Sequence, residues 1–122
     1  MVGRALLQTR MRRGAGVYAA LMLRHVNLLT WKDGTEEAAI KAFSEHLSGY
    51  AAEIPEIRDM SFGSDLGLAE RNVDFAIIVD FDDEDAFSRY LLHPAHARMV
   101  GEFLKPILES RQAIQFQVPA TR

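Results

Sequence analysis

The most informative stretch of this sequence is Tyr90-Leu91-Leu92-His93-Pro94-Ala95-His96, a predicted corner between two helices. Proline is tolerated in the first turn of a helix, because the backbone N–H that it lacks has no helical partner there. Pro94 therefore predicts that a helix begins beside it. His93 then lies just outside this helix, and His96 is its third residue.

Two polar side chains are predicted to point inward from this corner. His96 shares a helical face with apolar residues further along, and such a face turns toward the core. The apolar residues of this face are Val100, Phe103, Leu104 and Ile107. Tyr90 ends the preceding helix and points inward beside Phe87, three residues earlier. An imidazole and a phenol therefore point into the interior from adjoining helices. This arrangement predicts a pocket, but the sequence does not identify its ligand.

The remaining patterns predict an α+β fold. Alternating residues predict strands at 23–31, 57–63, 73–81 and 114–118. Helical periodicity predicts helices at 36–54, capped by Thr35, at 82–91, and from Pro94 to about 106. This β-α-β-β-α-β order is the split βαβ arrangement of ferredoxin-like domains, with a four-stranded antiparallel sheet and helices on one face.

The sheet is predicted to need a cover on its second face. In the strand at 73–81, Phe75 and Ile77 lie on one face, but Ala76 and Ile78 make the other face apolar too. In a sheet with helices on one side only, the residues along each strand should instead alternate between apolar and polar. The chain is too short to supply more helices, so we expect a homodimer formed through the sheet face.

Length and composition predict one globular domain, at residues 22–118, in a chain of 122 residues. There is no cysteine, which excludes disulfides and thiolate chemistry, and no apolar run long enough to span a membrane. All of the acidic residues follow Lys32, so the body of the chain is acidic. We therefore expect a cytoplasmic protein that binds neither nucleic acid nor membrane.

Residues 1–21 form a basic arm without sustained periodicity. We expect this arm to be poorly ordered or an extension from an upstream start site, with Met22 beginning the folded part. A processed targeting segment is the other interpretation.

Three other polar residues need an explanation. His25 and Asn27 share a strand face with apolar residues, so either this face lines a polar pocket or the two residues satisfy each other and the backbone. His93 is expected to cap its helix. His46 lies one position from the apolar face of its helix and is expected to be solvated.

The sequence lacks several common functional motifs. His93 and His96 have helical spacing, but no HExxH frame or carboxylate at ligand spacing accompanies them, so we expect no metal. No serine lies in a nucleophile elbow, and no glycine-rich phosphate loop or dinucleotide fingerprint is present. We therefore expect no cofactor.

The chain resembles the stress-responsive A/B barrel domain family. The resemblance covers about residues 22–118 and rests on His25-Val26, Ile54-Pro55-Glu56-Ile57-Arg58, the corner from Tyr90 to His96, and Gly101-Glu102-Phe103-Leu104-Lys105-Pro106. It implies a ferredoxin-like protomer whose sheet packs on that of a second copy, as a dimeric α+β barrel.

Members of this family include plant polyketide cyclases, which close a linear poly-β-ketone by aldol condensation without a cofactor. In these enzymes a histidine at the position of His96 looks like the base, and a tyrosine at the position of Tyr90 assists it. Another histidine of the cyclases matches His25. The cyclases carry a further histidine where this chain has Phe75. The resemblance therefore implies a more apolar pocket here.

Three functions remain open from the sequence. The first is a cofactor-free cyclase or lyase in which neutral His96 takes a proton next to a carbonyl, Tyr90 donates to the enolate oxygen and His25 orients them. Its small, largely apolar carbonyl-type ligand would contact Asn27, Phe75, Phe87 and Val100. The second is a non-catalytic, stress-related dimer that binds a ligand. The third, by fold analogy alone, is a cofactor-free monooxygenase.

Overall fold

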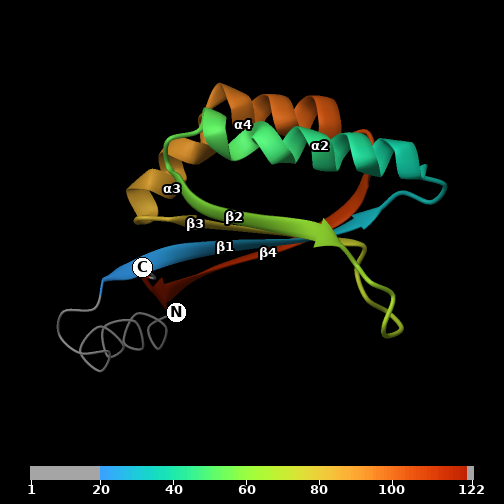
Figure 1. Ribbon diagram of the computed structural model, residues 1–122, viewed down its shortest axis with the longest axis horizontal. Coiled ribbons are helices and arrows are strands. Elements are labelled where there is room, and N and C mark those ends of the chain that lie inside the picture. Colours follow the sequence, from blue (N-terminus) through green and yellow to red (C-terminus); the bar gives the residue numbers. More distant parts are fainter. Residues whose placement is uncertain (1–19, 121–122) are drawn as a thin grey trace.

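The computed structural model describes residues 20–120. Its elements, in chain order, are β1 (Leu21–Trp31), α2 (Glu37–Glu53), β2 (Ile57–Ser64), β3 (Phe75–Phe81), α3 (Glu84–Leu91), α4 (Pro94–Arg98), the π-helical segment η1 (Met99–Leu104) and β4 (Leu108–Pro119) (Figure 1). The predicted β-α-β-β-α-β order is confirmed. Residues 1–19 of the predicted basic arm lie outside the described residues.

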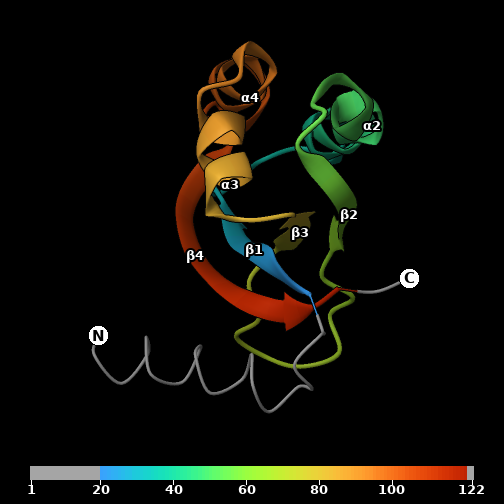
Figure 2. The same ribbon diagram turned by 90° about the vertical axis from the view of Figure 1, so that its left-hand side faces the viewer.

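The four strands form one antiparallel sheet in the order β2-β3-β1-β4. All the helices lie on one face of this sheet (Figure 2). The register pairs His25 with Gln115 and Leu29 with Arg111 on β4. Since paired residues point to the same face, Gln115 and Arg111 lie on the helix-covered side together with His25.

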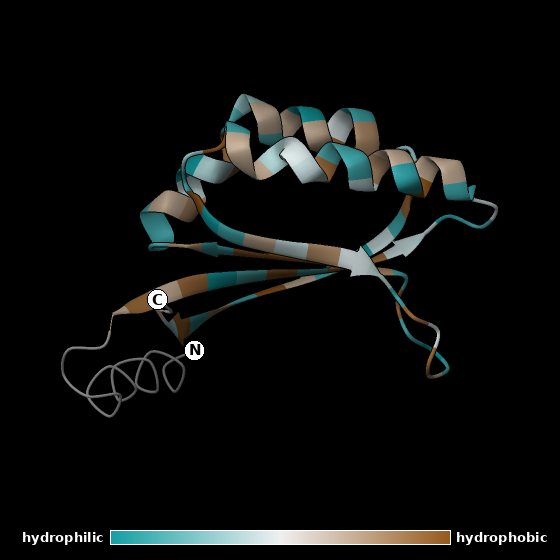
Figure 3. Cartoon of the chain, in the orientation of Figure 1, coloured by the Kyte–Doolittle hydropathy of each residue, from teal (hydrophilic) through white to brown (hydrophobic). Residues whose placement is uncertain are grey.

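The core lies between the sheet and the helices. Alternate residues of β1 are buried, beginning at Leu23 and ending at Trp31, which confirms the predicted strand and its inward face. The helices in Figure 3 change between hydrophilic and hydrophobic along their length, as expected of elements with one apolar face. The inward face of α2 is buried at Phe43, Leu47 and Tyr50, and Ile54 at its end is buried too.

The opposite face of the sheet carries an apolar patch, which we define by Val26, Ile78, Ile114 and Phe116. The register places Val26 between Ile78 and Ile114. Ile114 and Phe116 are 57% and 42% exposed. No helix within residues 20–120 covers this face (Figure 2).

The corner forms as predicted at its beginning. His93 is the N-cap of α4, where its Nδ1 accepts a hydrogen bond from the Ala95 N–H at 3.0 Å, and Pro94 is the first helical residue. Further on, the helix widens into η1, in which the Lys105 N–H donates to the Val100 carbonyl at 2.8 Å. This bond spans five residues, so the regular spacing predicted after His96 is interrupted.

Two local predictions were wrong. Thr35 does not cap α2: its hydroxyl donates to the Lys32 carbonyl at 2.6 Å, and Glu36 is the N-cap. His46 is not simply solvated, because its ring stacks on Phe103 with centroids 3.9 Å apart. Among the helices in residues 20–120, none is long and apolar enough to cross a membrane.

Candidate functional site

A cavity of about 250 Å³ lies between the sheet and the helices. Six of the seven predicted site residues line it: His25, Asn27, Phe87, Tyr90, His96 and Val100. Residues that the sequence did not single out for the site also line it, including Tyr50, Ile77, Arg111 and Gln115. The structure therefore brings the predicted imidazoles and phenol together around one internal space.

Phe75 is the exception, since it does not line this cavity. It packs in the core beside Trp31 and Phe43, with ring centroids 5.5 and 5.4 Å away. The residue that β3 contributes to the cavity is Ile77, which is paired with Asn27. At this level of β3 the cavity wall is therefore aliphatic.

His96 approaches the cavity from the first turn of α4. Its ring meets that of Tyr90 edge-on, with centroids 4.7 Å apart. Burial lowers the pKa of His96, and the positive charge of Arg111 adds to this effect, while the Leu91 backbone acts in the opposite direction. A neutral imidazole carries one N–H and one lone pair, so one of its ring nitrogens can accept a proton. His96 is therefore neutral near pH 7 and has one basic nitrogen.

Tyr90 is held by a second tyrosine from α2. The Tyr50 hydroxyl donates a hydrogen bond to the Tyr90 oxygen at 3.1 Å, in a buried environment. Burial raises the pKa of both phenols, whereas the bond from Tyr50 and the charge of Arg111 partly lower that of Tyr90. Because the Tyr90 oxygen is already an acceptor, its own O–H remains available to donate to a ligand.

His25 is held between two amides. Its Nε2 lies 2.9 Å from Nδ2 of Asn27, and its Nδ1 lies 2.9 Å from Nε2 of Gln115. A neutral imidazole has one N–H and one lone pair, so one of these amides presents its oxygen to the ring. The Asn27 Oδ1 is buried and has no partner among the described residues. In either orientation, one end of the Asn27 amide is left without a protein partner.

The environment of His25 keeps it neutral. Its side chain is buried, and burial lowers its pKa to about 4, with further lowering by the charges of Arg111 and His96. Both ring nitrogens are already used within the protein. His25 and Asn27 contact each other and also line the cavity, so the two interpretations that the sequence left open do not exclude each other.

Tyr50 and Gln115 fall within the predicted helix at 36–54 and the predicted strand at 114–118, but no role was predicted for either residue. A tyrosine at a fully buried helix position must find a hydrogen-bond partner, and this was the available signal for Tyr50. Gln115 alternates with apolar residues on β4, and only its pairing with His25 in the sheet shows that it faces the helices. No local signal identifies either partner, because Tyr90 and His25 are 40 and 90 residues away in the sequence.

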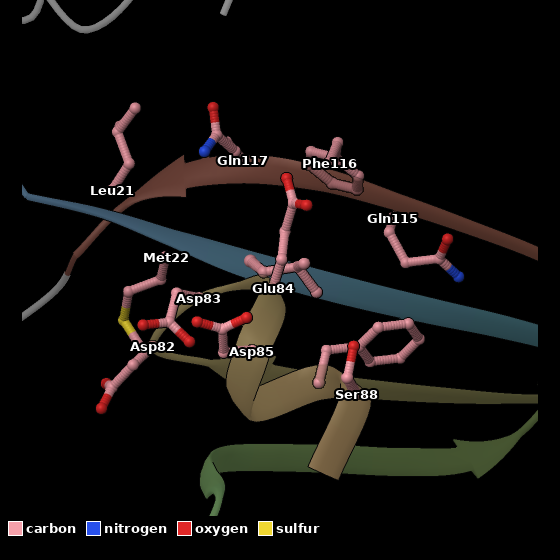
Figure 4. A pocket seen from close by; sticks show the side chains of 12 residues that line it. Leu21, Met22, Asp82, Asp83, Glu84, Asp85, Ser88, Gln115, Phe116 and Gln117 are labelled. Carbon is pink, nitrogen blue, oxygen red and sulfur yellow. The ribbon is translucent and has the colours of Figure 1, made fainter. Parts of the chain in front are cut away.

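A second hollow, of about 520 Å³, lies between the first turn of α3 and the strands β1 and β4. Figure 4 shows the carboxylates of residues 82–85 gathered there. Two of them have structural partners: Asp82 pairs with Arg58 at 2.8 Å, and Asp83 accepts from the Ala86 N–H at 2.8 Å. None of the described residues lining this hollow is a histidine. We therefore place the candidate chemistry in the smaller cavity.

Within residues 20–120, no three histidine or acidic side chains are grouped so that they could hold a metal ion. The groups available in the cavity are two imidazoles, two phenols, two amides and one guanidinium. This set can accept one proton at His96 and can donate hydrogen bonds to a ligand oxygen.

Comparison with known proteins agrees with the fold. Residues 23–118 match the stress-responsive A/B barrel domain family. The chain belongs to this family. An uncharacterized protein of Streptomyces coelicolor is 34% identical over 77 residues, which cover 62% of this chain and 79% of that protein.

Solved structures extend the comparison. A dimeric ferredoxin-like protein of unknown function from Thermobifida fusca is 37% identical, with a TM-score of 0.75 over 81% of this chain and 92% of that one. A hydroxynitrile lyase from Passiflora edulis has a TM-score of 0.71 at 18% identity, covering 83% of this chain and 96% of that one. At that identity the likeness to the lyase shows the fold alone.

Proposed function

We propose that this A/B barrel protein is a cofactor-free enzyme that removes a proton from carbon next to a carbonyl. The observation that carries the proposal is the neutral imidazole of His96, edge-on to Tyr90 at 4.7 Å, beside an internal cavity. A base and a hydrogen-bond donor on the same space are the two groups that enolate formation requires.

In the proposed reaction, the free ring nitrogen of His96 takes the proton from the α-carbon. The electron pair of the broken C–H bond moves toward the carbonyl oxygen, where the Tyr90 O–H stabilises the developing negative charge. Tyr50 fixes the Tyr90 oxygen through its hydrogen bond. His25 acts as a positioning residue, because both of its nitrogens are already in use.

The substrate is small and largely apolar. A cavity of about 150 Å³ is sufficient for a benzene molecule, so the cavity here holds a compound somewhat larger than a single ring. Leu29, Leu47, Ile77 and Val100 give it an aliphatic wall. The unpartnered amide end of Asn27 offers one further polar contact to a ligand. The lyase from Passiflora edulis supports the proposal only in that an enzyme has this fold.

The proposed active form is a homodimer in the cytoplasm, paired through the apolar patch of the sheet. The relatives from Thermobifida fusca and from Bacteroides fragilis are described as dimeric, the latter at 25% identity with a TM-score of 0.70 over 80% of this chain and 96% of that one. A second copy would cover Ile114 and Phe116, which are otherwise exposed.

Deuterium exchange tests the proposed chemistry without knowledge of the natural substrate. In D₂O, the protein should accelerate exchange of the C–H protons next to the carbonyl of 1-phenylpropan-2-one. Proton NMR measures the rate of this exchange. His96→Ala should lower this rate by about 100-fold or more, since it removes the base. A non-catalytic ligand-binding dimer would instead bind the ketone without accelerating exchange.

The matched control is His93→Asn at the same corner. Asparagine is a good N-cap, so this variant keeps α4 in place while it removes the neighbouring imidazole. It should exchange protons at the wild-type rate. Wild-type protein that gives no acceleration with this ketone, or a His96→Ala variant as active as the wild type, would contradict the proposal.

A further inference from the structure

We propose that the ligand carries a carboxylate that binds to Arg111 at the mouth of the cavity, so that the substrate is a keto acid. The inference names the substrate class for the proposed function and rests on it. Its test measures binding alone, so it fails or succeeds separately from catalysis.

Arg111 reaches the cavity from the edge strand β4. It is paired with Leu29, and so lies on the helix-facing side of the sheet in the same phase as Gln115. Arg111 lines the cavity and is exposed to solvent. The other polar residues among the described lining are buried or half-buried, so we place Arg111 at the mouth of the cavity.

Among the described residues that line the cavity, Arg111 is the one that is permanently charged, and none is an aspartate or a glutamate. Four other arginines within residues 20–120 form ion pairs with carboxylates, namely Arg24, Arg58, Arg89 and Arg98, but Arg111 is in none of these pairs. Its guanidinium is therefore available to an anion from outside the described chain.

The charge of Arg111 extends into the cavity. It contributes to lowering the pKa values of His25, Tyr90 and His96. A positive charge close to three uncharged groups, with no acid beside them, favours an anionic ligand over a neutral or cationic one.

The geometry favours a carboxylate in particular. A guanidinium presents two parallel N–H donors that match the two oxygens of a carboxylate. With its carboxylate at Arg111, a short keto acid would extend inward along the aliphatic wall toward Tyr90 and His96. Arg111 would then orient the carbonyl for the Tyr90 hydroxyl.

The experiment compares 4-phenylbutanoate with its neutral counterpart 4-phenylbutanamide, by isothermal titration calorimetry at neutral pH. Wild-type protein should bind the carboxylate about tenfold more tightly than the amide, a difference of about 1.4 kcal/mol. Arg111→Gln should remove this preference while leaving the affinity for the amide within about twofold. Arg98→Gln, on the exposed side of α4, should behave like the wild type.

A second readout separates ligand binding from a purely structural role. Bound 4-phenylbutanoate would offset the charge of Arg111, and so should raise the pKa of His96 measured by NMR in the wild type but not in Arg111→Gln. Equal binding of the two compounds by the wild type, a carboxylate preference that survives in Arg111→Gln, or no saturable binding of 4-phenylbutanoate would each overturn the inference. Loss of deuterium exchange alone would count against the proposed reaction and not against this site.

Discussion

Tyr50 determines how well Tyr90 can donate to a ligand. Its hydroxyl occupies an acceptor position on the Tyr90 oxygen, which leaves the Tyr90 proton directed elsewhere. Hydrogen bonds in such a chain polarise one another, so a donor that is itself an acceptor becomes a stronger donor. The pair therefore works as a unit, although the two residues come from different helices.

We predict that Tyr50→Phe lowers kcat/KM for deuterium exchange by about 3- to 10-fold, the usual worth of one neutral hydrogen bond. Tyr90→Phe should lower kcat/KM further, because it removes the hydroxyl that we propose as the donor to the enolate oxygen. The double variant should be no slower than Tyr90→Phe alone, since Tyr50 acts only through Tyr90. Additive losses in the double variant would show that Tyr50 acts independently.

Protonation of His25 should make the fold sensitive to acid. Its pKa is lowered to about 4 in the folded protein, whereas it is near 6.5 when unfolded. Between these values the unfolded state binds the proton and the folded state does not, so the free energy of unfolding falls as the pH falls from 6.5 toward 4. The loss is on the order of 3 kcal/mol if the whole difference is realised.

Urea unfolding between pH 7 and 4 measures this loss. His25→Leu should flatten the pH dependence, even if the variant is less stable throughout, because leucine does not titrate. His96, whose pKa is also lowered, should account for part of the slope that remains. A slope that is unchanged in His25→Leu would place the titrating group elsewhere.

Single residues show both what the sequence reveals and what it does not. The inward positions of His25, Tyr90 and His96 follow from periodicity, and the structure places all three at one cavity. Phe75 also faces inward, but it lies at the level of Trp31 and not of the cavity. Periodicity specifies which side of a strand a residue occupies, and the level along the strand at which a cavity forms depends on packing by other elements.

The helices are well specified by their sequence at the beginning and less so at the end. Pro94 and His93 fix the first turn of α4 because their preferences are local. The π-helical widening at residues 99–104 has no such local marker, and its two end residues, Met99 and Leu104, are both buried in the core. The predicted strand boundaries lie within a few residues of the observed ones, except at the start of β4. This strand begins at Leu108, whereas the prediction began at residue 114.

Helix α2 offers a test of helix propensity without a change in packing. Gly49 lies on its exposed side, and a Cβ atom added there would meet nothing within 4 Å. We predict that Gly49→Ala raises the free energy of unfolding by about 0.5–1 kcal/mol, because alanine loses less conformational entropy than glycine in a helix. Urea unfolding at neutral pH measures the change. Destabilisation by this substitution would indicate that this surface is covered by another chain.

As a whole, the molecule has two different faces. Helices cover the side that holds the cavity, and the apolar patch occupies the other. Arg24 and Asp80 form a two-bond ion pair on that second face, with both contacts at 2.9 Å. The apolar residues of the strand at 73–81 predicted this second face. Side chains alternate between the two faces of a strand whatever covers the sheet, so the sequence alone indicates which residues lie there.

We predict that the protein sediments with twice the chain mass of 13.7 kDa and that Ile114→Asp converts it to the single-chain mass. The substitution is tolerated in a monomer, where Ile114 is exposed, but it would bury an unpaired carboxylate in a dimer. Ala38→Asp, on the exposed surface of α2, is the control and should leave the mass unchanged. Analytical ultracentrifugation measures both variants, and a wild-type protein that sediments as a single chain would exclude the dimer.

The pH dependence of kcat/KM for deuterium exchange into 1-phenylpropan-2-one tests whether His96 is the base. Burial lowers the pKa of His96, so the neutral form persists to lower pH than for a solvated histidine. The account predicts that kcat/KM rises with pH along a limb whose midpoint lies below 6.5, and that this limb disappears in His96→Ala. A midpoint at or above 6.5, or the same limb in His96→Ala, would contradict it.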